Sequence, residues 1–419
     1  MKYSIGYKLL TVIVFHSMSW QTFSQNMNSP YSIYGIGDID LKPYNRTSGM
    51  GGTGLAIRSS YFLIDNNPAA IAGLTRSFFI VDGAVTGKSV TYSGSPITAN
   101  NSANKDFWIK RLSLAVKLNN HWASSIGFNQ ISNVNYKFYG TKSAEGSATN
   151  YLAYYEGDGG LNEYHWTNAF SLGKHLSFGL KSSIIAGSIN QTETIADENT
   201  GSTISTKVQD YFGKGRFQFG YIYSTAVGKK WDVSVGGKYV PAIKITSERT
   251  LTVDQDGSTI IEDEFIKNDR FSLPKTYAAG IAIKHNKKTT FAADYTYEDW
   301  SSLKIKEQGW QMITNNKLSA GVEFSKQARM MNQLMEKRYF QVGAFYNTGY
   351  LQIRNEPIKE YGITAGMGGI IGKGLIYSLA IEAGSRGTTQ QKLIKEQYVQ
   401  MTFTFSYRDF LASKGRKYD

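Results

Sequence analysis

The stretch Val399-Gln400-Met401-Thr402-Phe403-Thr404-Phe405-Ser406-Tyr407-Arg408 alternates apolar with polar side chains without a break. Because successive side chains of a β-strand point to opposite faces, this strand would have one apolar and one polar face. Thirteen further segments follow the same rule, near residues 77–92, 107–118, 122–137, 163–173, 175–190, 206–227, 231–252, 275–286, 289–299, 316–326, 339–349, 358–371 and 375–386. The connections between them are alternately short and long. This pattern predicts an all-β fold, a transmembrane antiparallel β-barrel of about fourteen strands whose apolar face meets lipid.

A secreted β-sandwich or β-propeller also alternates and carries turn signals. Strands in such proteins are usually about five or six residues long, whereas several segments here run past ten, which favours the barrel. One connection, residues 327–338, is long where a short turn is due. It predicts either a small periplasmic helix or an error of one hairpin in the strand count.

The first 24 residues are predicted to be a signal peptide, because Lys2 and Lys8 flank a short apolar core, Leu9 to Phe15. That core is too short to span a bilayer as a helix. The chain has no cysteine, which excludes a lipid anchor on cysteine, disulfides and thiolate metal sites. We therefore expect an exported protein in the cell outer membrane, with the barrel at residues 77–408 and a short periplasmic tail at 409–419.

The net charge of +13 at pH 7 suits contact with membrane lipid and lipopolysaccharide, or attraction of anionic solutes into a lumen. The basic residues are spread along the chain without a nucleic-acid-binding motif, so no nucleic acid partner is expected. We expect a monomer, and a partner protein could bind its extracellular loops.

Residues 25–76 differ in composition and pattern from the rest of the chain. They are rich in Gly, Tyr, Asn and Ser and show no sustained alternation. Such a segment is unlikely to fold alone, and we expect an N-terminal hatch, or plug, packed inside the barrel. Its Gly49-Met50-Gly51-Gly52-Thr53-Gly54 formally matches a dinucleotide-binding fingerprint, but no strand precedes it and no helix follows it. The alternative, a glycine-rich stretch needed for close packing, is favoured.

Other groups of residues give little indication of a metal-binding or catalytic site. The Asp254–Gly257 segment resembles the start of a calcium loop, but Asp-Gly between strands is more often a turn, and calcium binding there is left open. The histidines show no metal-ligand spacing. We expect no metal, no cofactor and no catalytic residues, although a barrel phospholipase or protease is an alternative.

The plug sequence resembles the FadL family of outer-membrane transporters for long-chain fatty acids and other hydrophobic compounds. The resemblance rests on Gly51-Gly52-Thr53-Gly54-Leu55-Ala56 followed by Asn66-Asn67-Pro68-Ala69-Ala70. It implies a hatch domain before a fourteen-stranded barrel, with hatch residues at Gly51, Gly52, Gly54, Asn67, Pro68 and Ala69. It also implies that a ligand leaves sideways, through a gap made by a kinked strand.

In this chain the third strand is the candidate for that lateral gate, because Ser132 and Asn133 interrupt its alternation. Ligand-binding candidates near the mature N-terminus, by position in the family, are Tyr31, Tyr34 and Ile36. Inward-facing cations are candidates by charge and side alone: Arg111, Lys117, Lys181 and Lys238. For all of these, simple plug or wall packing is the alternative.

The function implied by the resemblance is passive uptake of hydrophobic or amphipathic small molecules such as long-chain fatty acids. A second hypothesis is a permanently plugged barrel, structural or associated with protein secretion, that binds a partner protein. A third is a general porin, against which the plug argues. An apolar pocket between plug and wall would favour a transporter, and an exposed apolar patch on the loops would favour a scaffold.

Overall fold

The computed structural model describes residues 29–76, 78–95, 97, 102–143, 150–197, 200–330, 333–371 and 374–410. The predicted signal peptide and the tail from residue 411 lie outside them. The described chain forms a closed antiparallel barrel of fourteen wall strands, as the alternation predicted. The wall elements are β2 (Phe78–Gly94), β3 (Ala103–Lys117), β4 (Trp122–Gln130), β5 (Ser132–Ser143), β6 (Asn150–Leu172), β7 (Leu176–Ala196), β8 (Thr203–Val227), β9 (Trp231–Val240), β10 (Ile243–Gln255), β11 (Ser258–Leu273), β12 (Thr276–His285), β13 (Thr289–Glu298), β16 (Asn315–Met330), β17 (Gln333–Asn347), β20 (Glu360–Ile371), β21 (Leu375–Gly387) and β22 (Ile394–Phe410).

Three wall strands are interrupted and are each made of two elements: β4 with β5, β9 with β10, and β11 with β12. The barrel closes where the first wall strand, β2, pairs with the last, β22, from Phe78 opposite Phe410 to Gly94 opposite Ile394. The two faces of β22 confirm the alternation, because Phe403 and Phe405 are exposed while Thr402 and Thr404 are buried. The exposed apolar face suits lipid, and the buried polar face lines the interior.

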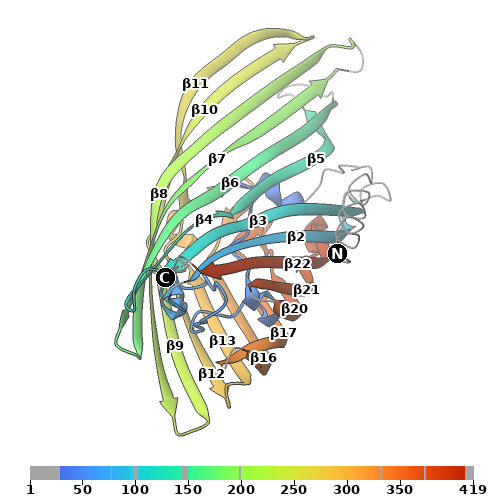
Figure 1. The fold of residues 1–419 in the computed structure, drawn as a ribbon. Coiled ribbons are helices and arrows are strands. Elements are labelled where there is room, and N and C mark those ends of the chain that lie inside the picture. The colour runs from blue at the N-terminus through green and yellow to red at the C-terminus, as the bar shows by residue number, and fades with distance from the viewer. Residues whose placement is uncertain are drawn as a thin grey trace, which may run out of the picture.

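Several strands are longer than expected. The segments 138–162, 191–205 and 253–274 were predicted to be largely loops, and the structure extends β5, β6, β7, β8, β10 and β11 through most of them. These extensions form a curved sheet that rises well above the rest of the wall (Figure 1). Their polar composition hid them, because strands beyond the membrane have no lipid to face and lose the apolar side of the pattern.

The helix expected as one alternative at 327–338 is wrong. β16 and β17 extend through that connection as a hairpin, with Gln327 opposite Glu336 and Met330 opposite Gln333. The Asp254–Gly257 segment is also a hairpin turn, between β10 and β11, with Asp256 and Gly257 both at positive φ. Among the described residues no group of three or more His, Asp or Glu side chains is arranged to hold a metal ion.

No helix in the described ranges is long and apolar enough to cross a membrane. The short turns lie at one end of the barrel and the long connections at the other, which we take as the periplasmic and extracellular ends. Two long connections cover the extracellular mouth with a small four-stranded sheet. Its strands are β14 (Lys306–Glu307), β15 (Trp310–Met312), β18 (Leu351–Ile353) and β19 (Glu356–Pro357).

The N-terminal segment, residues 29–76, lies inside the barrel and is called the plug below (Figure 1). It contains three short 3₁₀ helices, η1 (Pro30–Ile33), η2 (Arg46–Met50) and η3 (Pro68–Gly73), and a two-residue strand, β1 (Asp38–Ile39). The short helix η3 packs against β6, β7 and β8, while η2 packs against β16, β17 and β20. The plug therefore contacts opposite sides of the wall.

Candidate functional site

Asn67 fixes the plug to the wall. Its side chain is fully buried, and its Nδ2 donates hydrogen bonds to three backbone carbonyls: Leu55 at 2.9 Å, Tyr221 at 3.0 Å and Gly237 at 3.2 Å. Its Oδ1 accepts from the Ala69 amide and so caps η3, which begins at Pro68. Asn67, Pro68 and Ala69 thus seat the plug on β8 and β9.

The wall makes room for this seat with glycine. A Cβ on Gly220 would stand 2.0 Å from Asn67 Oδ1, and one on Gly343 would stand 2.2 Å from the backbone carbon of Met50. Any larger residue there would push the plug off the wall. The close approach of two backbones explains why the inner face carries glycine where the alternation calls for a polar residue.

The predicted glycines of the plug have separate local roles. Gly51 ends η2 at a φ of 69° and donates its amide to Thr364 Oγ1 at 2.8 Å. Gly52 also has a positive φ, 77°, which favours glycine. The Gly54 amide donates to Asp294 Oδ2 on β13 at 2.7 Å. The segment is a turn pressed against the wall, which matches the packing alternative for the glycine-rich motif.

Arg46 holds the other side of the plug. Its guanidinium pairs with Glu323 on β16 at 2.7 Å and with Glu336 on β17 at 2.6 Å. It also lies between the rings of Phe62 and Tyr339, 4.0 and 4.1 Å from their centroids. The sequence does not single out Arg46, because an arginine in an irregular segment gives no pattern that distinguishes a buried anchor from a solvated charge.

A third set of ion pairs ties the plug to β3. Arg111 pairs with Asp65 of the plug at 2.7 Å and with Asp82 on β2. Lys110 pairs with Asp40 at 3.0 Å. Burial opposes ionisation of Asp40, but the charges of Lys110 and Lys42 and a hydrogen bond from Tyr44 outweigh it, holding the pKa of Asp40 well below its usual range.

The same balance acts on Asp65. Burial opposes its ionisation, but the nearby charges of Arg111 and Lys181 and a hydrogen bond from Asn45 hold the pKa of Asp65 well below its usual range. Lys42 of the plug reaches the far wall, where its Nζ contacts Glu360 at 2.8 Å and Glu382 at 2.7 Å. Charges of the plug are therefore matched by charges of the wall on several sides.

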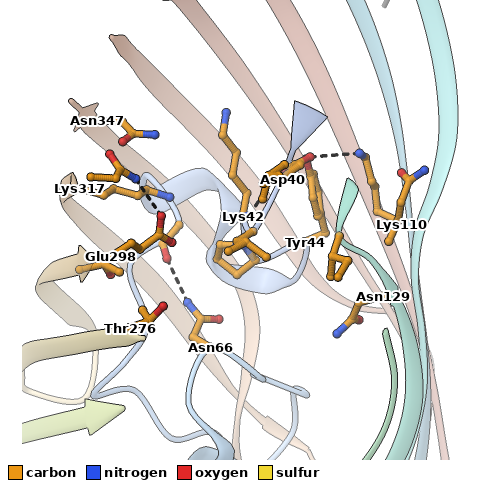
Figure 2. Close-up of a pocket in the computed structure, with 18 of the residues that line it drawn as sticks. Asp40, Lys42, Tyr44, Asn66, Lys110, Asn129, Thr276, Glu298, Lys317 and Asn347 are labelled. Atoms are coloured by element: carbon orange, nitrogen blue, oxygen red, sulfur yellow. Dashed lines mark hydrogen bonds and ion pairs between the residues drawn. The ribbon is translucent and has the colours of Figure 1, made fainter. Parts of the chain in front are cut away.

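A cavity of about 260 Å³ lies between the plug and the extracellular cap. Nine Lys and Arg and seven Asp and Glu side chains are among the described residues that line it. Figure 2 shows Asp40, Lys42 and Tyr44 of the plug on one side of Lys110, with Lys317 and Glu298 across the cavity. The lining therefore mixes many charged side chains with apolar ones such as Leu41 and Leu351, unlike the wholly apolar pocket expected for a purely hydrocarbon ligand.

The structure separates the predicted ligand-binding residues into three groups. Arg111, Lys181 and Lys238 line the cavity. Lys117 lies toward the periplasmic end and donates to the Ala72 carbonyl at 2.6 Å. Lys181 is already paired with Glu163 at 2.6 Å.

The aromatic candidates lie elsewhere. Tyr31 and Ile36 are buried in an apolar cluster below the extracellular cap, with Trp300, Leu351 and Ile358. Tyr34 packs against the Trp310 ring at 5.3 Å. The Tyr31 hydroxyl donates to the Ile394 carbonyl. Burial keeps the pKa of Tyr31 above its usual value, so the hydroxyl stays protonated. These three residues join the plug to the cap, and their role toward a ligand stays a prediction.

The third wall strand is broken where its alternation failed. β4 ends at Gln130, Ile131 lies outside both strands, and β5 begins at Ser132. Pairing between β3 and β4 stops at Arg111 opposite Asn129, and β5 pairs with β6 rather than with β3. The upper part of β3, from Ala103 to Lys110, and β5 therefore diverge (Figure 1).

The plug occupies the inner side of this break. β1 pairs with β5 across it, with Asp38 opposite Asn133 and Ile39 opposite Ser132. The Asp40 amide also donates to the Ile131 carbonyl at 2.9 Å. Because Ile131 and Asn133 line the cavity, the cavity extends to the break in the wall.

These features define a closed antiparallel barrel whose interior is filled by an N-terminal plug. Similar solved structures are the Ralstonia pickettii toluene transporter TbuX (16% identity, TM-score 0.58, covering 88% of this chain and 99% of that one), and a Pseudomonas aeruginosa FadL homologue (12% identity, TM-score 0.59, covering 90% and 100%). The Pseudomonas putida toluene transporter TodX is also similar (15% identity, TM-score 0.58, covering 89% and 100%). At such identities the likeness shows a shared fold.

The sequence itself matches the family model described as BamG over residues 7–419. The chain therefore belongs to the BamG family. The resemblance to FadL proteins holds for the fold, while the family that the sequence matches has a different name. No curated protein sequence matches the chain.

Proposed function

We propose that this protein is an outer-membrane channel for passive uptake of hydrophobic or amphipathic small molecules, long-chain fatty acids among them. The observation that carries the proposal is the broken third strand beside the cavity, whose inner side is covered by the plug, with Asp38 and Ile39 paired to β5 and the Asp40 amide bonded to the Ile131 carbonyl. Moving β1 would join the cavity to the seam between β3 and β5. A lateral exit spares an apolar molecule the aqueous periplasmic route.

The charged side chains that line the cavity limit the class of ligand that fits it. A hydrocarbon without a head group would gain nothing from the charges that line it, and it would displace their water at a cost. An amphiphile with one polar end fits better, because the head group can face the charges while the chain leaves through the seam. The structural neighbours named as toluene transporters share the fold, and the charged lining favours a different ligand here.

A reversible tether tests the gate. Asp38 and Asn133 are Cα partners on paired antiparallel strands, so the double variant Asp38→Cys, Asn133→Cys can form a disulfide. The chain has no cysteine of its own, which keeps other disulfides out of the test. We expect uptake of radiolabelled oleate by expressing cells to fall several-fold when oxidised and to recover on reduction.

The matched control is Val81→Cys, Tyr407→Cys, a pair on β2 and β22 at the closure of the wall. That disulfide leaves the plug free, so uptake should not change with oxidation. Equal uptake by the oxidised and reduced gate pair, with disulfide formation shown by gel shift, would reject lateral passage past β1.

A second candidate function is a plugged scaffold that binds a partner protein. It is favoured by the extended sheet above the membrane and by apolar side chains exposed on β11, with Ile260 at 58% and Phe265 at 61% exposed. Replacing residues 247–268 by an Asn-Gly turn removes these while keeping the β12 wall strand, since Ser247 and Asn268 are partners. Under the scaffold hypothesis, the complex of this protein with its partner should become smaller on native gels, while oleate uptake should persist. A complex of unchanged size argues against the scaffold hypothesis.

A further inference from the structure

The plug strand β1 is held on both of its edges. Toward the broken wall strand, the Asp40 amide that follows β1 donates to the Ile131 carbonyl at 2.9 Å. Because successive amides of a strand point to opposite edges, the Ile39 amide points away from the break, and it donates to the hydroxyl of Tyr350 at 3.0 Å. That hydroxyl also lies 3.5 Å from a carboxylate oxygen of Asp38. Tyr350 therefore contacts both residues of β1.

Tyr350 belongs to the extracellular cap. It directly precedes β18, and its carbonyl accepts from the Ile313 amide, just after β15, at 2.8 Å. Its ring packs against the ring of Trp300, a fully buried residue, with 5.3 Å between the two centroids. The two long connections that build the cap therefore meet at Tyr350, and its hydroxyl moves when they move.

The turn that leads into β1 is pressed between the cap and the wall. Gly35 and Gly37 both have positive φ, 65° and 90°. A Cβ on Gly35 would stand 2.9 Å from Met312 Cε in the cap. One on Gly37 would stand 2.6 Å from the Asn133 carbonyl oxygen on β5. Ile36 lies between them and is buried in the apolar cluster below the cap. Close packing therefore adds to the hydrogen bond in linking the cap to β1.

A second contact ties β1 to the wall. Arg386 on β21 pairs with Asp38 at 2.7 Å. This ion pair holds a side chain, which can rotate while the backbone shifts, whereas Tyr350 holds the backbone amide of Ile39. If β1 moved while the cap stayed in place, that amide and the buried Tyr350 hydroxyl would both lose their partner, which is costly inside a protein. The backbone of β1 is thus joined to the cap.

We propose that Tyr350 couples the extracellular cap to β1, so that separation of the two cap connections at the mouth releases β1 from β5. The mouth and the break in the wall then open together rather than in turn. The inference rests on the proposed function in taking release of β1 as the opening of the lateral exit. The coupling itself concerns only the cap and β1, and it is measured without any ligand.

The first test uses the absence of cysteine from the chain. The single variant Asn133→Cys places a thiol on β5 opposite Asp38, so the rate of labelling by a water-soluble maleimide reports how often β1 leaves that position. Adding Tyr350→Phe removes the hydroxyl and keeps the ring against Trp300. We expect labelling at position 133 to become about tenfold faster, the factor that loss of one buried hydrogen bond gives.

The matched control is Tyr295→Phe, which also removes one hydroxyl group. Tyr295 lies on the exposed face of β13, outside the cap and the plug, and its hydroxyl donates to Asn316 at 2.6 Å. Labelling at position 133 should keep its original rate in this variant. An equal acceleration in both tyrosine variants would show a general loosening of the barrel and would contradict the role given to Tyr350.

The second test locks the cap. Gln311 on β15 and Gln352 on β18 are Cα partners whose side chains contact each other, so Gln311→Cys, Gln352→Cys can form a disulfide between the two connections. In the Asn133→Cys background, oxidation should slow labelling at position 133 several-fold, and reduction should restore it. Peptide mass spectrometry reads position 133 alone, so thiols freed by reduction do not interfere. When Tyr350→Phe is also present, oxidation should lose most of its effect, because coupling free energy is a property of the linked pair.

The outcomes separate the coupling from the proposed uptake. Labelling that responds to neither Tyr350→Phe nor the cap disulfide overturns the coupling. Faster labelling in Tyr350→Phe without a response to the cap disulfide also overturns it, because Tyr350 would then hold β1 without transmitting movement of the cap. If Tyr350→Phe loses heat-modifiable mobility on gels, the cap disulfide in the otherwise unchanged chain carries the test. Coupling found together with oleate uptake that ignores the gate disulfide supports this inference and counts against the uptake route alone.

Discussion

Arg46 and Glu323 form an ion pair 2.7 Å long that joins the middle of the plug to β16. The same guanidinium reaches Glu336 on the neighbouring strand β17. One plug residue thus holds two strands of the wall, and β12 and β13 separate these strands from the seat of Asn67 on β8 and β9. Both contacts hold the plug, together with the ion pairs of Lys42, Asp40 and Asp65, and its release requires these contacts to open.

Replacing Arg46 by Gln should loosen the plug. The change leaves Glu323 and Glu336 buried without a cation, and breaking a buried ion pair costs about 3–5 kcal/mol. We expect single-channel conductance in planar bilayers to rise from near zero to frequent openings. Arg354→Gln, on the exposed cap turn, removes the same charge elsewhere and should leave the conductance unchanged. A silent Arg46→Gln channel would mean that the remaining contacts hold the plug.

Gly220→Ala should destabilise the seat of Asn67. The added Cβ would stand 2.0 Å from Asn67 Oδ1, so the plug or the strand must shift, at a cost of about 1–3 kcal/mol. Gly213→Ala, on the same strand, has nothing within 4 Å of its Cβ and is the matched control. Thermal unfolding followed by heat-modifiable gel mobility should show a lower midpoint for Gly220→Ala alone. Equal midpoints would show that the plug tolerates displacement from β8.

The Asn67→Asp variant tests the hydrogen bonds that Asn67 donates, rather than the room that Gly220 leaves for its side chain. The carboxylate is nearly isosteric, but it would face the carbonyls of Leu55, Tyr221 and Gly237 without a proton to donate. We expect limited proteolysis to cleave the plug about tenfold faster. Asn119→Asp is the comparison, because Asn119 only accepts from backbone amides in an exposed turn. Identical cleavage rates in the two variants would contradict the role given to Asn67.

Acid should release the plug only at low pH. An unfolded aspartate ionises near pH 3.9, and the folded pKa values of Asp40 and Asp65 are lower. Their contribution to seating is therefore complete well above that pH and is lost as the pH falls through the folded values. Protease protection of the plug should be constant from about pH 8 to pH 5 and decline below about pH 4. In Asp40→Asn this acid-dependent decline should be smaller, and loss of protection already near pH 6 would contradict the assignment.

The barrel was predictable because its signal is repeated in every strand and is enforced by lipid. Phe403 and Thr404 must face opposite environments, and any exchange would place a polar group in the membrane. The break near Ser132 was also visible as a fault in that alternation. The extended parts of β6, β7 and β8 were not, because above the membrane both faces meet water and the constraint disappears.

The site was less predictable than the wall. Asn67 and Gly54 could be picked out because their motif resembles a known plug, yet the partners Asp294 and Gly220 lie far away in sequence. Nothing local distinguishes Arg216 from Lys181, although Arg216 Nε has no hydrogen-bond partner among the described residues and Lys181 is paired with Glu163. Charge pairing across a closed barrel depends on strand register, which the pattern fixes only to within a few residues.

The height of the curved sheet also decides which part of the protein extends farthest from that end of the barrel. β8 has 25 residues whereas the wall strand β13 has 10, so the β10–β11 hairpin, which pairs with the upper part of β8, stands above its surroundings (Figure 1). At about 3.3 Å per residue, such a difference carries the turn at Asp256 and Gly257 tens of ångströms outward. A large molecule that approaches that end of the barrel would reach this turn before the plugged mouth. It is accordingly the natural place to insert an epitope tag that labels the protein on living cells.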